Sequence, residues 1–191
     1  IANDTVSLTA RTKDNKNNNW FALSALSAVS GDEYFLKLRD TLLLNHQQWN
    51  VAPDNYIRYS PKGIIVNNIA LLGDTSEIAI RSQQLEPNSP IDISITNFDL
   101  ANITSLLNSD TLIIGGVLNV KANVGELDKP LPGFTGDAGI TGLSYRQHLL
   151  GNLTANATKI SDNNIAAKLT LTGEGNNIQA SGNYYPTETE K

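Results

Sequence analysis

The chain has 191 residues, 40% of them hydrophobic and 17% charged, which is the composition of a folded protein and not of a disordered one. Its formal net charge is −5, so it lacks the cationic surface that binds phosphate backbones, and nucleic acid is not an expected partner. It has no cysteine, which excludes disulfides, thiol nucleophiles and thiolate metal sites.

Two further absences concern how the chain begins and whether it spans a membrane. There is no methionine, even at position 1, which favours a segment of a longer protein. No apolar run reaches the roughly 18 residues that a membrane-spanning helix needs.

Apolar and polar residues alternate with period two along much of the chain, which predicts strands, because successive side chains of a strand point to opposite faces of a sheet. We expect strands at residues 5–10, 34–44, 77–82, 91–96, 117–124, 152–158 and 166–172. Clusters of Asn, Asp, Gly and Pro predict turns at 13–19, 53–55, 60–63, 73–76, 86–90 and 161–164. The glycines that recur every third residue from Gly133 to Gly142 predict a loop leading into a strand. Together these signals predict an all-β fold with a mainly antiparallel sheet.

One segment breaks the alternation with the three-four spacing of an amphipathic helix. Its apolar positions are Phe98, Leu100, Ile103, Leu106 and Leu107. They predict a short helix at about 98–107, with Asn97 or Asp99 as its N-cap. We expect the apolar stripe to face the concave side of the sheet, with Asn102 and Ser105 directed outward.

The search for catalytic and metal-binding patterns gives no candidate. His46 and His148 are the only histidines, and neither belongs to an HExxH pair. There is no GxSxG elbow and no phosphate-binding Gly-Lys-Ser/Thr loop. Asx-turn chemistry explains the Asp/Asn-rich turns more simply than calcium does. We therefore expect no enzyme activity, no metal and no cofactor.

A family resemblance lies in the interrupted segment and its surroundings. The run F-D-L-x-x-I-x-x-L-L, a short gap and then G-G-V-L-N-V resembles the TamB family of cell-envelope proteins, relatives of AsmA. The matching positions are Phe98, Asp99, Leu100, Ile103, Leu106, Leu107, Gly116 and Leu118. The run toward Trp49, the segment 130–136, LLGNLTANA and the final ASGNYYP are similar to the family as well. Ser82 stands where the family often has glycine, and Asn119 replaces a small residue.

The resemblance implies a long sheet rolled into an open trough or half-barrel, with the whole chain as one elongated β segment. It implies that the parent protein is anchored in the inner membrane and crosses the periplasm. The implied role is phospholipid transport toward the outer membrane, or outer-membrane protein assembly with a BamA-like barrel partner. Acyl chains would then contact the apolar lining. The candidate lining residues are Ile91, Ile93, Ile95, Phe98, Ile103, Leu106, Leu107, Leu118, Val120, Ala122, Leu153, Ala155, Leu169 and Leu171.

The residue pattern leaves alternatives open. A closed β-sandwich has the same alternation, because one face of each of its sheets packs into a core. An adhesin-like module binding carbohydrate is the competing function, although the two tryptophans and six tyrosines form no single motif. Unpaired strand edges would also favour pairing between copies.

Overall fold

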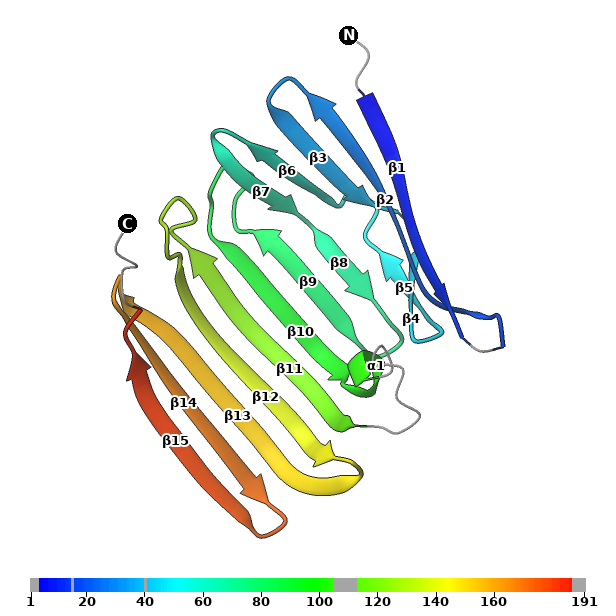
Figure 1. The fold of residues 1–191 in the computed structure, drawn as a ribbon. Helices are drawn as coiled ribbons and strands as arrows, with labels where there is room; N and C mark the ends of the chain where they lie inside the picture. Colours follow the sequence, from blue (N-terminus) through cyan, green and yellow to red (C-terminus); the bar gives the residue numbers. More distant parts are fainter. Residues whose placement is uncertain (1–3, 15, 40, 105–112, 187–191) are drawn as a thin grey trace.

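The fold is one large antiparallel sheet, as the computed structural model in Figure 1 shows. The structure describes residues 4–14, 16–39, 41–104 and 113–186. Within them, 14 of the 15 strands follow the order β15-β14-β13-β12-β11-β10-β9-β8-β5-β4-β2-β3-β6-β7, and the remaining strand, β1, pairs with β2. The sheet curves without closing into a barrel, so the expected all-β open trough is confirmed.

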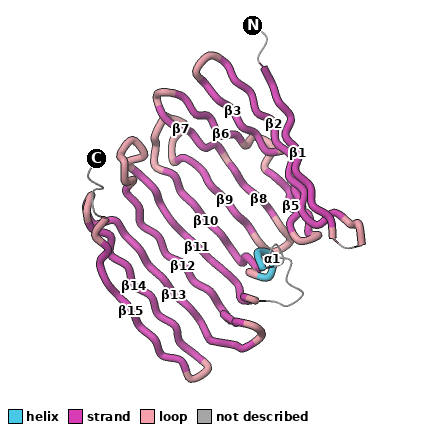
Figure 2. Tube along the Cα trace, in the orientation of Figure 1, coloured by secondary structure: helices cyan, strands magenta, loops and turns pink. Residues whose placement is uncertain are grey.

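The first half of the chain contains the short strands, β3–β9, after two long ones, β1 and β2, whereas all strands of the second half are long (Figure 2). The first half contains β1 (Asp4–Lys13), β2 (Asn19–Ser30), β3 (Glu33–Leu38), β4 (Thr41–Leu44), β5 (Gln47–Val51), β6 (Tyr56–Ser60), β7 (Gly63–Asn67), β8 (Ile69–Leu72) and β9 (Glu77–Ser82). The second half contains β10 (Ile91–Asp99), β11 (Ile114–Gly125), β12 (Gly133–Tyr145), β13 (His148–Ser161), β14 (Asn164–Gly173) and β15 (Asn176–Tyr184).

The strand order of the first half looks complex because it is an antiparallel meander in which some strands are interrupted in the middle. β3 and β4 both pair with β2, and the next strand along the chain is likewise split into β5 and β6. The expected single strand at 34–44 is therefore interrupted. The expected turn at 53–55 is present, and it lies at the break between β5 and β6, where the Asn55 N–H donates a hydrogen bond to the Ala52 carbonyl.

Asn55 bridges these breaks with its side chain. Its Oδ1 accepts a hydrogen bond of 2.8 Å from the backbone N–H of Leu38, and its Nδ2 donates to the Leu38 and Ala52 carbonyls. The residue is buried. A side-chain amide thus replaces ladder bonds that the breaks remove, which satisfies backbone groups that would otherwise be buried without partners.

In the second half, a line of β-bulges bends adjacent strands at the same level. Asn97, Gly116, Gly142, Gly151 and Gly173 all have positive φ, and the strand registers shift beside the first four of them. A bulge adds a residue to one strand and bends it locally. Because the bulges follow one another from β10 to β13, they bend these neighbouring strands at the same level.

The two faces of the sheet differ in polarity. In the middle of the molecule, apolar side chains from separate strands of the same face contact one another. There a buried cluster forms from Leu42, Trp49, Val51 and Phe98. Half-buried side chains from β3, β4, β8, β9, β10 and β11 pack against it. The apolar face is therefore the concave one, and only part of it is covered by other residues of the chain.

The helix begins later than predicted, and its predicted end near residue 107 lies outside the described residues. The described helix α1 spans Ala101–Thr104, while Phe98 and Asp99 belong to strand β10, so the predicted start at residue 98 is wrong. Asp99 caps the helix, because its Oδ1 accepts a hydrogen bond from the Ala101 N–H. Asn102 is buried, which contradicts its expected outward direction. Its Oδ1 accepts a hydrogen bond from Asn45 of the neighbouring hairpin, so tertiary polar contacts decide its direction.

The glycine-rich segment is also different from the prediction. Residues 133–142 are not a loop but form most of β12, which pairs with β11 and β13 along its length. Glycine is tolerated there because long neighbours on both sides supply the backbone hydrogen bonds. At Gly136 a Cβ would lie only 3.2 Å from the Ala122 side chain.

Candidate functional site: an open apolar trough

The candidate site is the concave face of β10–β15, where the strand register aligns apolar side chains in rows. One row consists of Ile93, Ala122, Gly136, Ala157, Ala167 and Gly182. The next row consists of Ile95, Val120, Ala138, Ala155, Leu169 and Ala180. A third consists of Phe98, Leu118, Ile140, Leu153, Leu171 and Ile178. The predicted lining residues of β10, β11, β13 and β14 therefore share one face of one sheet.

Three of the predicted lining residues lie in or after the helix, and the structure does not describe their side chains. Ile103 belongs to α1, but its side chain is not among those described, and Leu106 and Leu107 lie outside the described residues. Phe98 is buried in the closed cluster.

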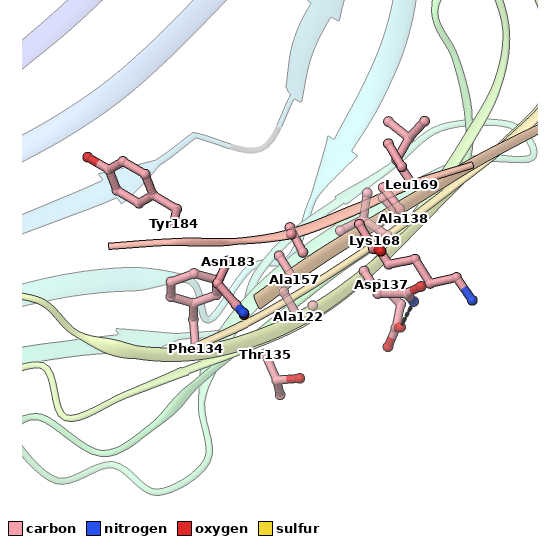
Figure 3. Close-up of a pocket in the computed structure, with 18 of the residues that line it drawn as sticks. Ala122, Phe134, Thr135, Asp137, Ala138, Ala157, Lys168, Leu169, Asn183 and Tyr184 are labelled. Atoms are coloured by element: carbon pink, nitrogen blue, oxygen red, sulfur yellow. Dashed lines mark hydrogen bonds between the residues drawn. The ribbon is translucent and has the colours of Figure 1, made fainter. Parts of the chain in front are cut away.

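A cavity of about 730 Å³ lies along the open part of this face. Its floor consists of small side chains from five consecutive strands, namely Ala122, Gly136, Ala138, Ala155, Ala157, Ala167, Ala180 and Gly182. Larger side chains border it, among them Phe134, Leu169 and Tyr184. Figure 3 shows these three on one side of the strands and Thr135 and Asp137 on the other. The floor is low because its residues are small, and the taller borders make it a trough.

The trough has the dimensions of an extended hydrocarbon chain. Four ladder spacings between β11 and β15 amount to about 19 Å. This length is enough for an acyl chain that spans one leaflet of a bilayer core, which is about 15 Å deep. The volume lies within the roughly 300–1,000 Å³ range of small-molecule pockets. Leu169 is 36% exposed and Ile178 51% exposed, so apolar side chains face solvent along the trough.

The convex face carries polar side chains that bond across the strands. Asp92 accepts hydrogen bonds from Asn123 at 2.8 Å and Gln83 at 3.1 Å, and these bonds hold the pKa of the Asp92 carboxyl below its usual value. Asp137 accepts a hydrogen bond from Asn156. These cross-strand pairs add to the stability of the sheet from its convex side.

One end of the trough carries a network of four charges. We call this end the upper lip; it comprises the β11–β12 loop and the β13–β14 turn, which lie at the upper left in Figure 1. Lys159 Nζ lies 2.6 Å from Asp162, 3.3 Å from Glu126 and 2.7 Å from the Leu131 carbonyl oxygen, and Lys129 Nζ lies 2.9 Å from Glu126.

The lip charges hold one another in the ionised state. The hydrogen bond from Lys159 lowers the pKa of Asp162, and those from Lys129 and Lys159 lower the pKa of Glu126. The bond to Asp162 raises the pKa of Lys159, and the bond to Glu126 raises the pKa of Lys129. At neutral pH the lip thus presents two positive and two negative side chains.

Several trough residues were not predicted, although a signal for them exists. In β12, Phe134, Gly136, Ala138 and Ile140 do alternate with more polar neighbours, but the glycines obscure the period. In β15, Ile178, Ala180, Gly182 and Tyr184 alternate with Asn, Gln and Ser. A reading that counted glycine and alanine as inward-facing would have found both strands.

The described residues contain no cluster of three or more His, Cys, Asp or Glu side chains placed to hold a metal ion. Among the same residues, no helix is long and apolar enough to cross a membrane. Compared with protein-family models, curated proteins and solved structures, the chain gives no match.

Proposed function

We propose that the chain is a periplasmic segment of an envelope protein similar to the TamB family, and that its trough carries phospholipid acyl chains toward the outer membrane. The observation that supports this proposal is the apolar face that is open along a cavity lined by five consecutive strands, β11 to β15. Each CH₂ group of an acyl chain that leaves water for such a surface gains about 0.8 kcal/mol. A continuous surface therefore lowers the cost of moving a chain through water, and it needs no catalyst.

The partner and the location belong to the same proposal. The parent protein would be anchored in the inner membrane, and a BamA-like barrel would receive it at the outer membrane. Assistance to outer-membrane protein assembly would use the same apolar face, because a strand of an outer-membrane protein that has not yet inserted also exposes apolar side chains at alternate positions.

A photo-crosslinking residue placed on either face tests the role in acyl-chain transport. At Ile93 or Leu169, on the concave face, it should capture phospholipid from cells or vesicles. At Asp92 or Thr170, one position away on the convex face, it should capture none, because a shift of one residue reverses the side-chain direction. Equal capture from both faces would refute the trough as a lipid path.

A single charge in the trough provides a second, functional test. Leu169→Lys should change the free energy of unfolding by less than about 1 kcal/mol, because an exposed site keeps the new charge hydrated. It should nevertheless abolish acyl-chain capture from Ile93. Thr170→Lys adds the same charge to the convex face and should leave capture intact.

A carbohydrate-binding module is the second candidate, and one feature favours it. The exposed rings of Tyr34 and Tyr59 lie 6.3 Å apart on β3 and β6, and such pairs form platforms for sugar rings. Polysaccharide binding that is lost in Tyr34→Ala/Tyr59→Ala and kept in Leu169→Lys would support this function instead.

A further inference from the structure

The lip network has one buried member, Lys159, and three partly exposed ones, of which Glu126 is bonded to both lysines. Lys159 is 4% exposed, and its ammonium group already contacts Asp162, Glu126 and the Leu131 carbonyl. Glu126 accepts bonds from both lysines. Lys129 is 43% exposed and Asp162 77% exposed, and each has one protein partner in the described part of the chain. A ligand at the lip therefore meets a cation at Lys129 and an anion at Asp162.

This charged lip is continuous with the apolar trough. A second cavity of about 410 Å³ is lined by Glu126, Lys129, Gly133, Lys159 and Asp162, together with residues 160–161. The next residue along β12, Phe134, lines the trough. Lys159 also pairs with Ile165, which pairs with Tyr184 at the border of the trough. A molecule with one apolar and one polar end can thus occupy both cavities at once.

We propose that the upper lip binds the zwitterionic headgroup of a phospholipid whose acyl chain lies in the trough, an inference that rests on the proposed function. The phosphate is placed toward Lys129 and the ammonium group toward Asp162. A purely anionic headgroup fits less well, because Glu126 and Asp162 repel its second negative or acceptor-rich end, and it leaves the exposed Asp162 carboxylate paired with Lys159 alone. The lip thereby selects headgroups that carry both charges.

Single-chain ligands with the same palmitoyl tail separate the headgroup from the tail. Isothermal titration of the purified chain would use lysophosphatidylethanolamine, lysophosphatidylglycerol and uncharged monopalmitin, each below its micelle concentration. We expect the ethanolamine lipid to bind about fivefold more tightly than the glycerol lipid, the size of one exposed ionic contact. The double variant Lys129→Gln/Asp162→Asn should bind both phospholipids equally.

A matched control removes one positive and one negative charge from the convex face. Asp137→Asn/Lys168→Gln should keep the fivefold preference, because both residues lie on that face. Circular dichroism checks that each variant folds. Should the double variant unfold, Lys129→Gln alone leaves the three contacts of Lys159 intact; it should weaken the ethanolamine lipid about fivefold and leave monopalmitin unchanged.

The outcomes distinguish the two proposals. If all three ligands bind the native chain equally, or the preference survives in the lip variant, the headgroup site is refuted while the trough stands. If none of the ligands binds, monopalmitin included, the acyl-chain function itself is refuted. Binding of free phosphoethanolamine as tight as that of its lysolipid would make the lip a site for a soluble ligand and would also overturn the proposal.

Discussion

The indole of Trp49 and the phenyl ring of Phe98 lie 6.0 Å apart, although β8 and β9 separate their strands in the sheet. In a flat sheet, three ladder spacings would place the two backbones about 14 Å apart. Gly73, at the end of β8, leaves room for the indole, since a Cβ there would lie 3.2 Å from the ring. The contact closes the trough at this point, and its loss should affect stability more than any change in the open part.

Trp49→Ala should therefore lower the free energy of unfolding by about 3–5 kcal/mol, because it leaves a large cavity in the closed cluster. Trp49→Phe should cost much less, since the buried indole N–H has no hydrogen-bond partner in the described structure and nothing polar is lost. Tyr59→Ala, at an exposed aromatic, is the control and should change little. Urea unfolding followed by circular dichroism measures all three. Similar losses for Trp49→Ala and Tyr59→Ala would contradict the closed cluster.

Asn55→Ala should cost about 2–3 kcal/mol, because it removes the side-chain amide that bonds the Leu38 N–H and carbonyl in a buried site, while the Ala52 carbonyl keeps the bond from the backbone N–H of residue 55. Asn55→Asp should cost more, since a carboxylate lacks the amide donors and buries a charge. Asn50→Ala on the exposed side of β5 serves as the reference. Chemical denaturation gives the three values, and equal stability of Asn55→Ala and Asn50→Ala would show that the bridge is dispensable.

Gly151→Ala should destabilise the sheet by about 3 kcal/mol. Its φ is +118°, and a Cβ would overlap the Thr172 carbonyl oxygen on the neighbouring strand. Gly182→Ala introduces the same methyl group where nothing lies within 4 Å and should be neutral or slightly stabilising. Thermal unfolding of both variants compares them directly. A tolerated Gly151→Ala would mean that the line of bulges does not shape the trough.

The lip network makes stability depend on pH in the acid range. The folded-state pKa values of Asp162 and Glu126 lie below their ordinary values of 3.8 and 4.5. Their contribution is therefore complete above those values and is lost as the pH falls through the lower folded-state values. The advantage of the native chain over Asp162→Asn should be present at pH 6 and shrink below about pH 4. Denaturation curves at pH 6 and pH 3 measure it, and a difference that does not change with pH would refute the ionic role of Asp162.

The family resemblance, the periplasmic location and the lipid cargo remain predictions, whereas much of the sheet could be predicted from the sequence. The alternation of Ile91, Ile93 and Ile95 with polar neighbours identified one face of β10, because the side-chain period of a strand is set locally. The break at Asn55 could not be predicted in this way. An Asn followed by a strand has the signature of a turn, and only the position of Leu38 on a neighbouring strand makes it a bridge.

The sequence by itself determined the strand class, the polarity of each face and the polar convex side, since all three depend on residues one or two positions apart. The tertiary structure alone decided which apolar residues are covered and which remain open. Phe98 is buried and Leu169 is partly exposed, yet both belong to alternating apolar strands. Their difference arises from the curvature that Gly116, Gly142 and Gly151 allow and from strands brought together across long stretches of chain. Burial depends on those distant contacts, and no local pattern encodes them.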